Sequence, residues 1–373
     1  MRQADMAGRP PVHPLRVAAL ALMLIGTLPA CGAAPIATTT PSPSASPTPT
    51  PSPASSPSPA VVTAGSPAWV DVSVASGWRS RSAPRPVDTP ALQNPAAVRA
   101  WLTGMTAADK VGLIDRLDTQ LLLGERVEVL EVDGDWTRIA VPDQPAPADP
   151  RGYPVWVPLR QLTALPPPDT GELVTVVTPT AVLRSADGTI EVSFGTTLPL
   201  VGGAGAIDIV GLPGGHGSMT VAATAVTAAG LTPTGASIVA TARRFLGLPY
   251  LWGGTSGFGF DCSGLVHLIY RAHGVVLPRD SDPQSKAAVA VSRSDLQPGD
   301  LVFFSSGGVA YHVALYAGSG MIIDSPSPGY AVEEIPLASM PIAGDYSGAR
   351  RPQAMARASR NAAEAAMPPM ITV

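Results

Sequence analysis

Residues 250–265 read YLWGGTSGFGFDCSGL, and this stretch predicts a cysteine nucleophile at the start of a helix. Cys262 directly follows an aspartate and a glycine-rich loop. The apolar residues after it recur at helical spacing (Leu265, Val266, Leu268, Ile269). At a helix N-terminus, the helix dipole and unpaired backbone N–H groups stabilise a thiolate. We therefore expect Cys262 to be a nucleophile, whereas a structural cysteine would more naturally lie inside a strand or mid-helix.

A histidine downstream supplies the second half of a catalytic pair. His312 begins the segment HVALYAG, which has the pattern of a half-buried strand followed by a turn. Past that turn, residues 321–323 predict another strand, and Asp324 ends it. Strand pairing would bring Asp324 beside His312, where it could accept the Nδ1–H hydrogen and hold the ring. The sequence thus predicts a Cys262–His312–Asp324 triad.

Composition limits the classes of partner. The chain has 373 residues, of which 14% are charged and 42 are proline, and its net charge is −4. A chain of this length predicts two or three domains. Without a basic cluster, nucleic acid is not expected as a partner. Because Cys and His do not cluster, we expect no metal, and no other cofactor is indicated.

The N-terminus predicts export. Three arginines precede an apolar run, residues 17–28, that ends in LPACG, and the run is too short to span a membrane. Residues 1–30 therefore predict a leader, and LPAC resembles the lipobox of bacterial lipoproteins. That resemblance implies acylation of Cys31 and a membrane-anchored, extracytoplasmic protein. An ordinary cleaved leader is the alternative.

Low-complexity sequence follows the predicted anchor. Residues 31–67 are rich in Pro, Ser and Thr, and this composition predicts a linker. If stiff, some thirty such residues extend about 90 Å. The tail, residues 353–373, is rich in Ala and Met, and its pattern indicates no role.

Two β units and a third domain are predicted between linker and tail. Residues 68–166 combine alternating segments with a helical insert at about 95–120. A hairpin turn at Asp133-Gly134-Asp135 supports strands there. This region resembles a bacterial SH3-type barrel, and residues 167–232 predict a second, less distinct unit. Residues 233–352 begin with an amphipathic helix (236–246) and contain the cysteine loop.

Several motifs of this third domain occur together in one order. They are GLPYLWGG, DCSGLV, LPRDSDPQ, LQPGDLVFF and HVALYAGSG, spread over about residues 237–351. Together they resemble the NlpC-type cell-wall cysteine peptidases, which have a papain-like fold. The resemblance implies an α+β protein in which a Cys-bearing helix packs on an antiparallel sheet, preceded by two small all-β SH3-like barrels. With those barrels, the chain is similar to the γ-D-glutamyl-L-diamino acid endopeptidases.

The resemblance also implies roles for individual residues. Tyr250 matches a tyrosine that helps to bind the oxyanion. The family's third triad position is usually histidine, sometimes asparagine or glutamine, so Asp324 is a departure. Asp261, Ser263 and Ser281 match positions that hold the free α-amine and backbone of an N-terminal L-Ala. Glu125 and Tyr153, from the first SH3-like unit, match residues that close the same pocket. Asp261 has a second interpretation as a helix N-cap, and one carboxylate can serve both roles.

These implications predict hydrolysis of peptidoglycan stem peptides. The expected bond joins γ-D-Glu to a diamino acid, here meso-diaminopimelate, in stems with a free L-Ala. One alternative is an endopeptidase that acts on the intact wall during remodelling. Another is a catalytically degenerate wall-binding lipoprotein, an alternative that the two SH3-like units and Asp324 favour. A third is acyl transfer, because an amine could intercept the thioester in place of water.

Overall fold

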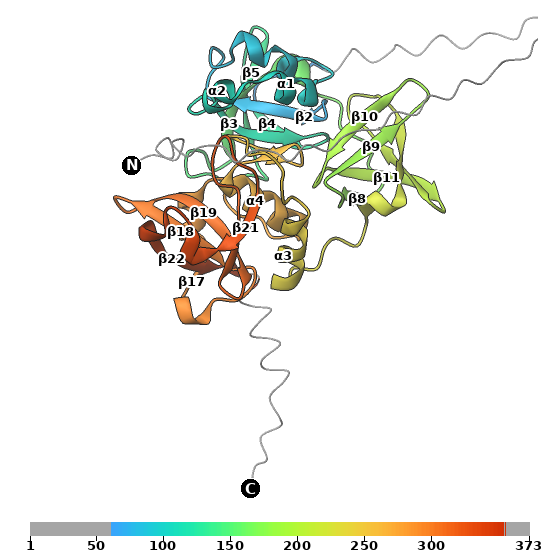
Figure 1. Cartoon of the computed structure of the whole chain (residues 1–373). Helices are drawn as coiled ribbons and strands as arrows, with labels where there is room; N and C mark the ends of the chain where they lie inside the picture. Colours follow the sequence, from blue (N-terminus) through green and yellow to red (C-terminus); the bar gives the residue numbers. More distant parts are fainter. Residues whose placement is uncertain (1–60, 354, 356–373) are drawn as a thin grey trace, which may run out of the picture. The chain divides into compact units, whose positions relative to one another are not determined.

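The structure is a computed structural model that describes residues 61–353 and 355. The predicted leader, Cys31, most of the linker and most of the tail lie outside the described residues. Three β-rich regions follow one another along the described part, each with its own sheet (Figure 1). None of the helices in this part combines the length and apolarity needed to cross a bilayer.

The first region, residues 67–163, is a seven-stranded antiparallel sheet, which we call module 1. Its hairpin of β4 and β5 turns at Gly134 (φ 57°), as the Asp-Gly pair predicted. The strand order is β3-β2-β6-β5-β4-β1-β7. The strands are β1 (Pro67–Val70), β2 (Val74–Trp78), β3 (Leu117–Leu122), β4 (Arg126–Asp133), β5 (Trp136–Val141), β6 (Tyr153–Pro158) and β7 (Leu162–Thr163).

The helical insert of module 1 is shorter than its sequence pattern predicted. It consists of a 3₁₀ helix, η2 (Pro86–Leu92), followed by α1 (Val98–Gly104) and α2 (Ala107–Val111). Asp115 then adopts a left-handed conformation (φ 61°), which interrupts helical geometry. The apolar positions from Leu117 onward belong to β3, which pairs with β2 from Leu117 to Leu122 and is buried along almost its whole length.

The second region, which we call module 2, repeats the topology of module 1. Its order, β10-β9-β13-β12-β11-β8-β14, equals that of module 1 with seven added to each number. A 3₁₀ turn before the last strand is also shared. The strands are β8 (Leu173–Val176), β9 (Thr180–Arg184), β10 (Thr189–Ser193), β11 (Thr197–Ala204), β12 (Ile207–Gly211), β13 (Ser218–Ala222) and β14 (Val226–Thr227). The less distinct sequence unit therefore folds as a second copy of the first.

The third region, residues 235–351, carries the candidate site. Its helices are α3 (Gly235–Arg243), α4 (Cys262–Ala272) and α5 (Ser281–Lys286). A short hairpin of β15 (Thr255–Ser256) and β16 (Gly259–Phe260) precedes α4. The main sheet has the order β17-β22-β18-β19-β20-β21. These strands are β17 (Val289–Val291), β18 (Leu301–Ser306), β19 (Val309–Gly318), β20 (Met321–Asp324), β21 (Glu333–Pro336) and β22 (Tyr346–Arg351).

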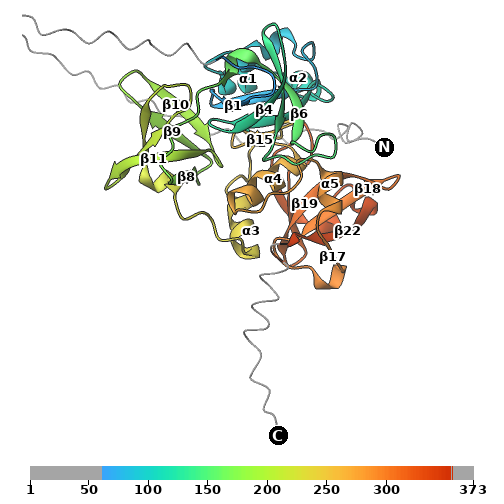
Figure 2. The ribbon, with the colours of Figure 1, turned by 180° about the vertical axis from the view of Figure 1, so that it is seen from behind.

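Helix α4 packs its apolar face on this sheet, as the spacing after Cys262 predicted (Figures 1 and 2). Leu265 and Ile269 on the helix share a core with Phe303 and Val313 on the strands. Each such buried side chain contributes about 1.5–3 kcal/mol through apolar burial. The architecture is α+β, a Cys-bearing helix on an antiparallel sheet after two antiparallel β modules, as predicted.

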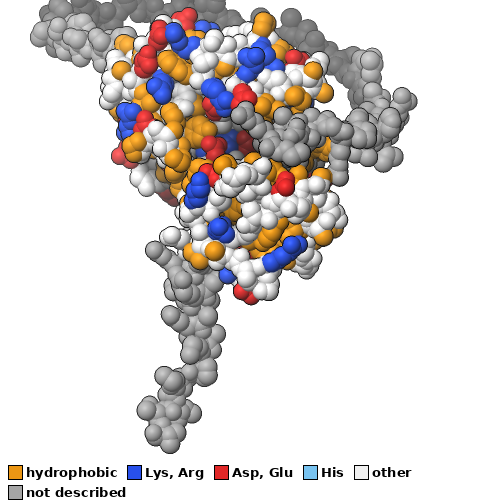
Figure 3. All heavy atoms as spheres, turned by 90° about the vertical axis from the view of Figure 1, so that its left-hand side faces the viewer, with side chains coloured by type: hydrophobic (Ala, Val, Ile, Leu, Met, Phe, Trp, Pro, Cys, Tyr) orange, Lys and Arg blue, Asp and Glu red, His pale blue; other side chains and the backbone are white. Residues whose placement is uncertain are grey.

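Charge is not segregated on the face that Figure 3 shows. Basic and acidic side chains lie interspersed there among hydrophobic ones. Such a mixture gives no extended field of one sign on that face, so selectivity must come from local groups.

Candidate active site

Cys262 is the first residue of α4, and Asp261 caps the helix. The Asp261 side chain accepts a hydrogen bond from the Gly264 N–H at 2.6 Å. Gly264 itself cannot carry a side chain, because a Cβ there would lie 2.0 Å from the Gly254 carbonyl oxygen. In the DCSG motif, Asp261 is therefore the helix cap, Cys262 is the nucleophile, and Gly264 allows the backbone of residue 254 to approach the helix. As the first residue of α4, Cys262 lies at the positive end of the helix dipole, which favours the thiolate.

His312 and Asp324 meet across the hairpin of β19 and β20. The His312 Nε2 atom lies 2.7 Å from Asp324 Oδ1, and both side chains are almost fully buried. The predicted pairing of the two residues is therefore present, but the nitrogen differs from the expected Nδ1. A shift in strand register between Tyr316 and Gly318 accompanies this geometry. With Nε2 taken by the carboxylate, Nδ1 is the nitrogen available to the Cys262 thiol.

The surroundings of His312 favour its charged form. Burial alone would lower the pKa of His312, but the Asp324 carboxylate and the Cys262 sulfur outweigh burial. Both act through charge and through hydrogen bonds to the ring, and the pKa rises well above the ordinary value. An imidazolium between carboxylate and sulfur is the state that a thiolate–imidazolium pair requires.

Tyr250 presents a buried hydroxyl near the sulfur. The side chain is 2% exposed, and within the described part of the chain its hydroxyl has no hydrogen-bond partner. Burial, followed by the charges of Asp261 and Cys262, raises the pKa of Tyr250 well above its usual range. A neutral, unpartnered O–H donor beside a nucleophile is suited to a developing oxyanion.

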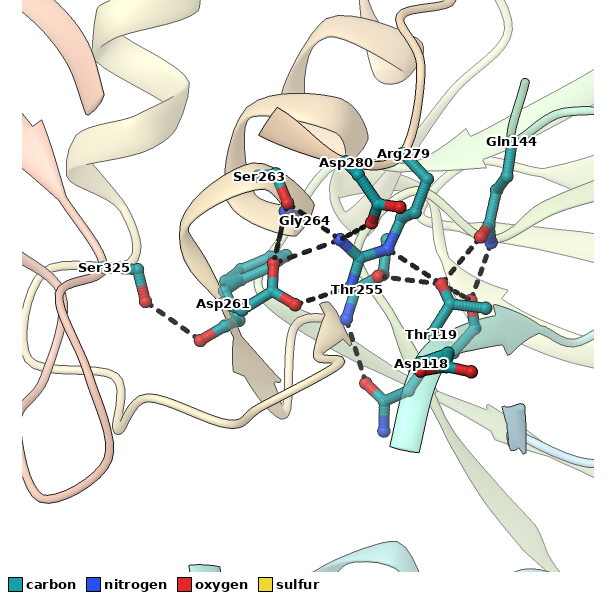
Figure 4. A network of polar contacts seen from close by, with 12 residues as sticks. Asp118, Thr119, Gln144, Thr255, Asp261, Ser263, Gly264, Arg279, Asp280 and Ser325 are labelled. Atoms are coloured by element: carbon teal, nitrogen blue, oxygen red, sulfur yellow. Dashed lines mark hydrogen bonds and ion pairs between the residues drawn. The ribbon is translucent and has the colours of Figure 1, made fainter. Parts of the chain in front are cut away.

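A buried arginine, Arg279, ties Asp261 to module 1 (Figure 4). Its Nη2 donates to Asp261 Oδ2 at 2.7 Å and its Nη1 to Oδ1 at 3.1 Å. It also donates to Ser263 Oγ (3.1 Å) and, from Nε, to Thr119 Oγ1 of module 1 (2.9 Å). Both Asp261 oxygens are thereby occupied and their charge is balanced. The role of Arg279 was missed by sequence reasoning, although it stands in the LPRDS motif, where a cation after proline was the available signal.

Ser281 and its helix α5 connect the two halves of the catalytic pair. The Ser281 hydroxyl donates to the Ala310 carbonyl, 2.8 Å away, two residues before His312. Gln284 donates from Nε2 to the carbonyl of Ser263, the residue after Cys262. The hydroxyl of Ser281 is therefore directed at the strand of His312, and α5 holds α4 and β19 at a fixed spacing.

Tyr153 of module 1 lies at the other end of this network. Its hydroxyl donates to Asp280 Oδ2 at 2.9 Å, and burial followed by the Asp280 charge raises the pKa of Tyr153. Asp118 is close enough for its charge to act on both groups. We call Asp118, Tyr153 and Asp280 the acidic cluster. Tyr153 was predicted at the pocket, but Asp118 and Asp280 were missed. Asp118 is far from the other site residues in the sequence, and Asp280 stands in the LPRDS motif beside Ser281.

Glu125 does not join this cluster. Its carboxylate lies 2.5 Å from Arg271 Nη2, and burial raises the pKa of Glu125 although Arg271 opposes the shift. Arg271 follows Cys262 by nine residues, so the pair lies about 13 Å further along α4. The prediction that Glu125 closes the pocket is corrected by this placement. A buried carboxylate needs a cation, and Arg271 at the far end of α4 provides it.

Comparison with known proteins agrees with this geometry. Residues 247–351 match the NlpC/P60 family. The gamma-D-glutamyl-L-lysine dipeptidyl-peptidase of Bacillus cereus is 41% identical over 306 residues, which cover 77% of this chain and 91% of that protein. The chain belongs to the NlpC/P60 family. The protein of the same name from Bacillus subtilis is 39% identical, covering 71% of this chain and 92% of that one.

A solved structure of the same family aligns with most of this chain. The crystal structure of an NlpC/P60 family protein from Bacillus cereus superposes with a TM-score of 0.73 at 41% identity. It covers 77% of this chain and 99% of that chain. The protein described here is a cysteine peptidase of the NlpC/P60 family, as its motifs predicted.

Two other kinds of site receive no support near Cys262. His267 lies inside α4, where burial lowers its pKa to about 3, so this ring stays neutral and is a core residue. Among the described residues, no group of three or more His, Cys, Asp or Glu side chains has an arrangement that could hold a metal ion.

Proposed function

We propose that this NlpC/P60 peptidase hydrolyses the amide between γ-D-Glu and a diamino acid in peptidoglycan stem peptides that begin with a free L-Ala. One observation carries the proposal: in the acidic cluster of Asp118, Tyr153 and Asp280, Tyr153 donates to the half-exposed Asp280, which directly follows Arg279, the partner of the Cys262 cap Asp261. Arg79 already pairs with Asp118 at 2.8 Å, whereas Asp280 has its nearest cation, Arg279 Nη1, at 4.0 Å, so Asp280 is the carboxylate that an ammonium group there would meet in a charge-assisted hydrogen bond.

The chemistry follows from the triad. Cys262 attacks the amide carbon as a thiolate, and the oxyanion accepts the Tyr250 O–H hydrogen bond. His312 gives its proton to the leaving amine, which departs as the diamino acid end of the stem. A thioester to γ-D-Glu remains. Water then attacks it while His312, held by Asp324, takes the proton, and the dipeptide L-Ala-D-Glu is released with Cys262 restored.

The names of the relatives support this choice of bond. Two proteins about 40% identical over most of their length are named gamma-D-glutamyl-L-lysine dipeptidyl-peptidases. An enzyme that releases a dipeptide must measure its substrate from the free end. The negative charge of Asp280 suits this task, because it attracts an ammonium and does not favour an acylated or glycan-linked terminus.

The test compares three substrates with the full chain. They are L-Ala-γ-D-Glu-meso-diaminopimelate, its N-acetyl derivative and intact sacculi. We expect cleavage of the first, a kcat/KM at least about 100-fold lower for the second because its ammonium is missing, and slow release from sacculi. Equal or faster release from sacculi would favour the wall-remodelling alternative. If Cys262→Ala left cleavage unchanged, the catalytic proposal would be wrong.

We also propose that the protein is tethered outside the cytoplasm through Cys31. The support is the sequence alone: a short apolar run, LPAC, and the Pro-rich stretch after it. The prediction is checked by fractionating cells that express the chain or Cys31→Ala. The parent chain should sediment with membranes and the variant should not. Equal amounts of the two proteins in the membrane fraction would contradict a tether through Cys31.

A further inference from the structure

A second pocket lies on the catalytic domain beyond helix α5. Its volume is about 560 Å³. It is lined by side chains of α5 and of strands β17, β18 and β22, which Figure 2 shows near one another. The residues that matter are Lys286, Arg350, Ser305 and Ser347. We call this space the Arg350 pocket. The mechanism above does not use it.

The charge of the Arg350 pocket is positive. Two cations line it, and no Asp or Glu belongs to its lining. Lys286 is paired, with its Nζ 2.5 Å from Asp282 Oδ2. Arg350 has no acidic partner among residues 61–353: its Nε donates to the Ser285 carbonyl (2.9 Å) and its Nη1 to the Ala349 carbonyl (2.9 Å). The guanidinium is thus held in place by backbone oxygens while its charge stays uncompensated.

Hydroxyl groups complete an arrangement suited to an anion. Ser305 Oγ and Ser347 Oγ lie 2.6 Å apart, and Ser347 also donates to the Phe303 carbonyl at 3.2 Å, so Ser305 is the hydroxyl that can turn toward an anion. A planar guanidinium recognises a planar carboxylate through paired N–H···O bonds, and a serine hydroxyl adds a donor. Gly348, at φ +130°, leaves room beside the guanidinium, because its missing Cβ would lie 3.3 Å from Arg350 Nη1.

The pocket is connected to the catalytic pair through two elements. Ala310 lines it and lies two residues before His312 on β19. Helix α5 begins after Asp280 of the acidic cluster and ends at Lys286 in the pocket wall. Six helical residues span only about 9 Å. The acidic cluster and the pocket thus lie at opposite ends of α5, about 9 Å apart, a separation that two or three residues of an extended peptide can span.

We infer that the Arg350 pocket binds a carboxylate of the stem peptide, with Arg350 as the specificity-determining cation. The inference rests on the proposed function. The tripeptide has three carboxylates, and two of them vary among stem peptides and are the candidates: the α-carboxylate of γ-D-Glu and the side-chain carboxylate of diaminopimelate, which lysine lacks. Both would be recognised in the same way, so the experiment distinguishes them.

The test measures kcat/KM for three peptides with the full chain. They are L-Ala-γ-D-Glu-meso-diaminopimelate, the same peptide with the α-carboxylate of D-Glu as an amide, and L-Ala-γ-D-Glu-L-Lys. Arg350→Gln should lower kcat/KM for the first peptide by about 10- to 100-fold, the effect of one charge-assisted contact. For the peptide that lacks the recognised carboxylate, Arg350→Gln should change kcat/KM by less than about threefold. That peptide identifies the carboxylate that Arg350 binds.

Two further variants guard against a purely structural effect. Arg350→Lys keeps the charge but loses the paired N–H donors, so it should retain part of the discrimination and fall between the parent chain and Arg350→Gln. Ser347→Glu adds a negative charge at the exposed rim without removing the Arg350 contacts, and should reproduce the loss for the same peptides. The matched controls, Arg293→Gln and Ser294→Glu, alter exposed residues of the same domain outside the pocket lining and should leave all three values unchanged.

The outcomes separate the two proposals. If Arg350→Gln and Ser347→Glu lowered all three values by one common factor, the pocket would recognise neither of the two candidate carboxylates, and the inference would be overturned while the proposed function stood. If the parent chain cleaved none of the three peptides, the proposed function itself would fail, and the inference with it.

Discussion

At the scale of single residues, the site depends on which group faces which atom of His312. Asp324 binds Nε2, and this leaves Nδ1 for Cys262. An aspartate at this position gives the ring a full negative charge, where a neutral side chain would give only a hydrogen bond. The charge keeps the imidazolium stable despite complete burial, so the carboxylate should control the pH range of activity.

Replacing Asp324 with Asn should make the enzyme lose activity at a lower alkaline pH. The Asp324 carboxylate raises the pKa of His312, so its removal lowers that pKa, and the imidazolium is lost at lower pH. The alkaline limb of kcat/KM should move down by at least about one pH unit, equivalent to about 1.4 kcal/mol. The same sign applies to folding: stability from the charged ring is present below about pH 6.5 and disappears as the pH rises through the raised pKa. A pH–rate profile checks this, with the exposed Asp169→Asn as control, and an unchanged alkaline limb would contradict it.

Removing the Tyr250 hydroxyl should affect the chemical step alone. The O–H has no partner among the described residues, so Tyr250→Phe leaves no buried group unsatisfied. If it binds the oxyanion, kcat should fall by about 100-fold with little change in KM. Steady-state kinetics with Tyr311→Phe as the control measures the effect. A rise in KM at constant kcat would assign Tyr250 to substrate binding instead.

At the scale of elements, the N-terminus of α4 is the feature on which most contacts converge. Asp261 caps it, Gly264 permits the approach of residue 254, and Arg279 balances the cap. Helix α5 then fixes its distance from β19 through Ser281 and Gln284. A helix of six residues, in contact with the residue that follows Cys262, thus helps to position the nucleophile.

Substituting Arg279 with Met should destabilise the fold more than a typical surface change. Arg279 is 1% exposed and Asp261 is 8% exposed, so the variant would leave a buried carboxylate without its cation. Breaking a buried ion pair from one side costs about 3–5 kcal/mol. Denaturant unfolding monitored by fluorescence should report that loss, while exposed Arg160→Met should change stability by less than about 0.5 kcal/mol. Equal stabilities of the two variants would show that the network does not hold α4.

At the scale of the described chain, both β modules contact the loop before the nucleophile. Gln120 of module 1 accepts from the Thr255 N–H (3.1 Å) and the Ser256 hydroxyl (2.8 Å). Ser193 of module 2 accepts from the Gly257 N–H at 2.8 Å. The modules therefore act as parts of the catalytic unit, in addition to any role at the cell wall.

Truncating Gln120 to Ala should loosen this loop. Two buried donors lose their acceptor, at a cost of about 1–3 kcal/mol each. Amide hydrogen exchange of residues 255–262 should become at least about tenfold faster, and kcat should fall because Cys262 follows directly. The control Gln297→Ala alters an exposed side chain of the same domain. Unchanged exchange at residues 255–257 would mean that module 1 is not needed to order the loop.

Local sequence patterns determined the elements of this protein, and long-range contacts determined how their side chains are used. The start of α4 at Cys262, the strand of His312 and the Asp133-Gly134 hairpin each follow from a few adjacent residues, because periodicity and turn chemistry are local. The nitrogen bound by Asp324, the partner of Glu125, and the meeting of Asp118 with Tyr153 depend on residues far apart in the chain. Only tertiary packing brings such groups together, since buried charges take their partners from whatever the fold places beside them.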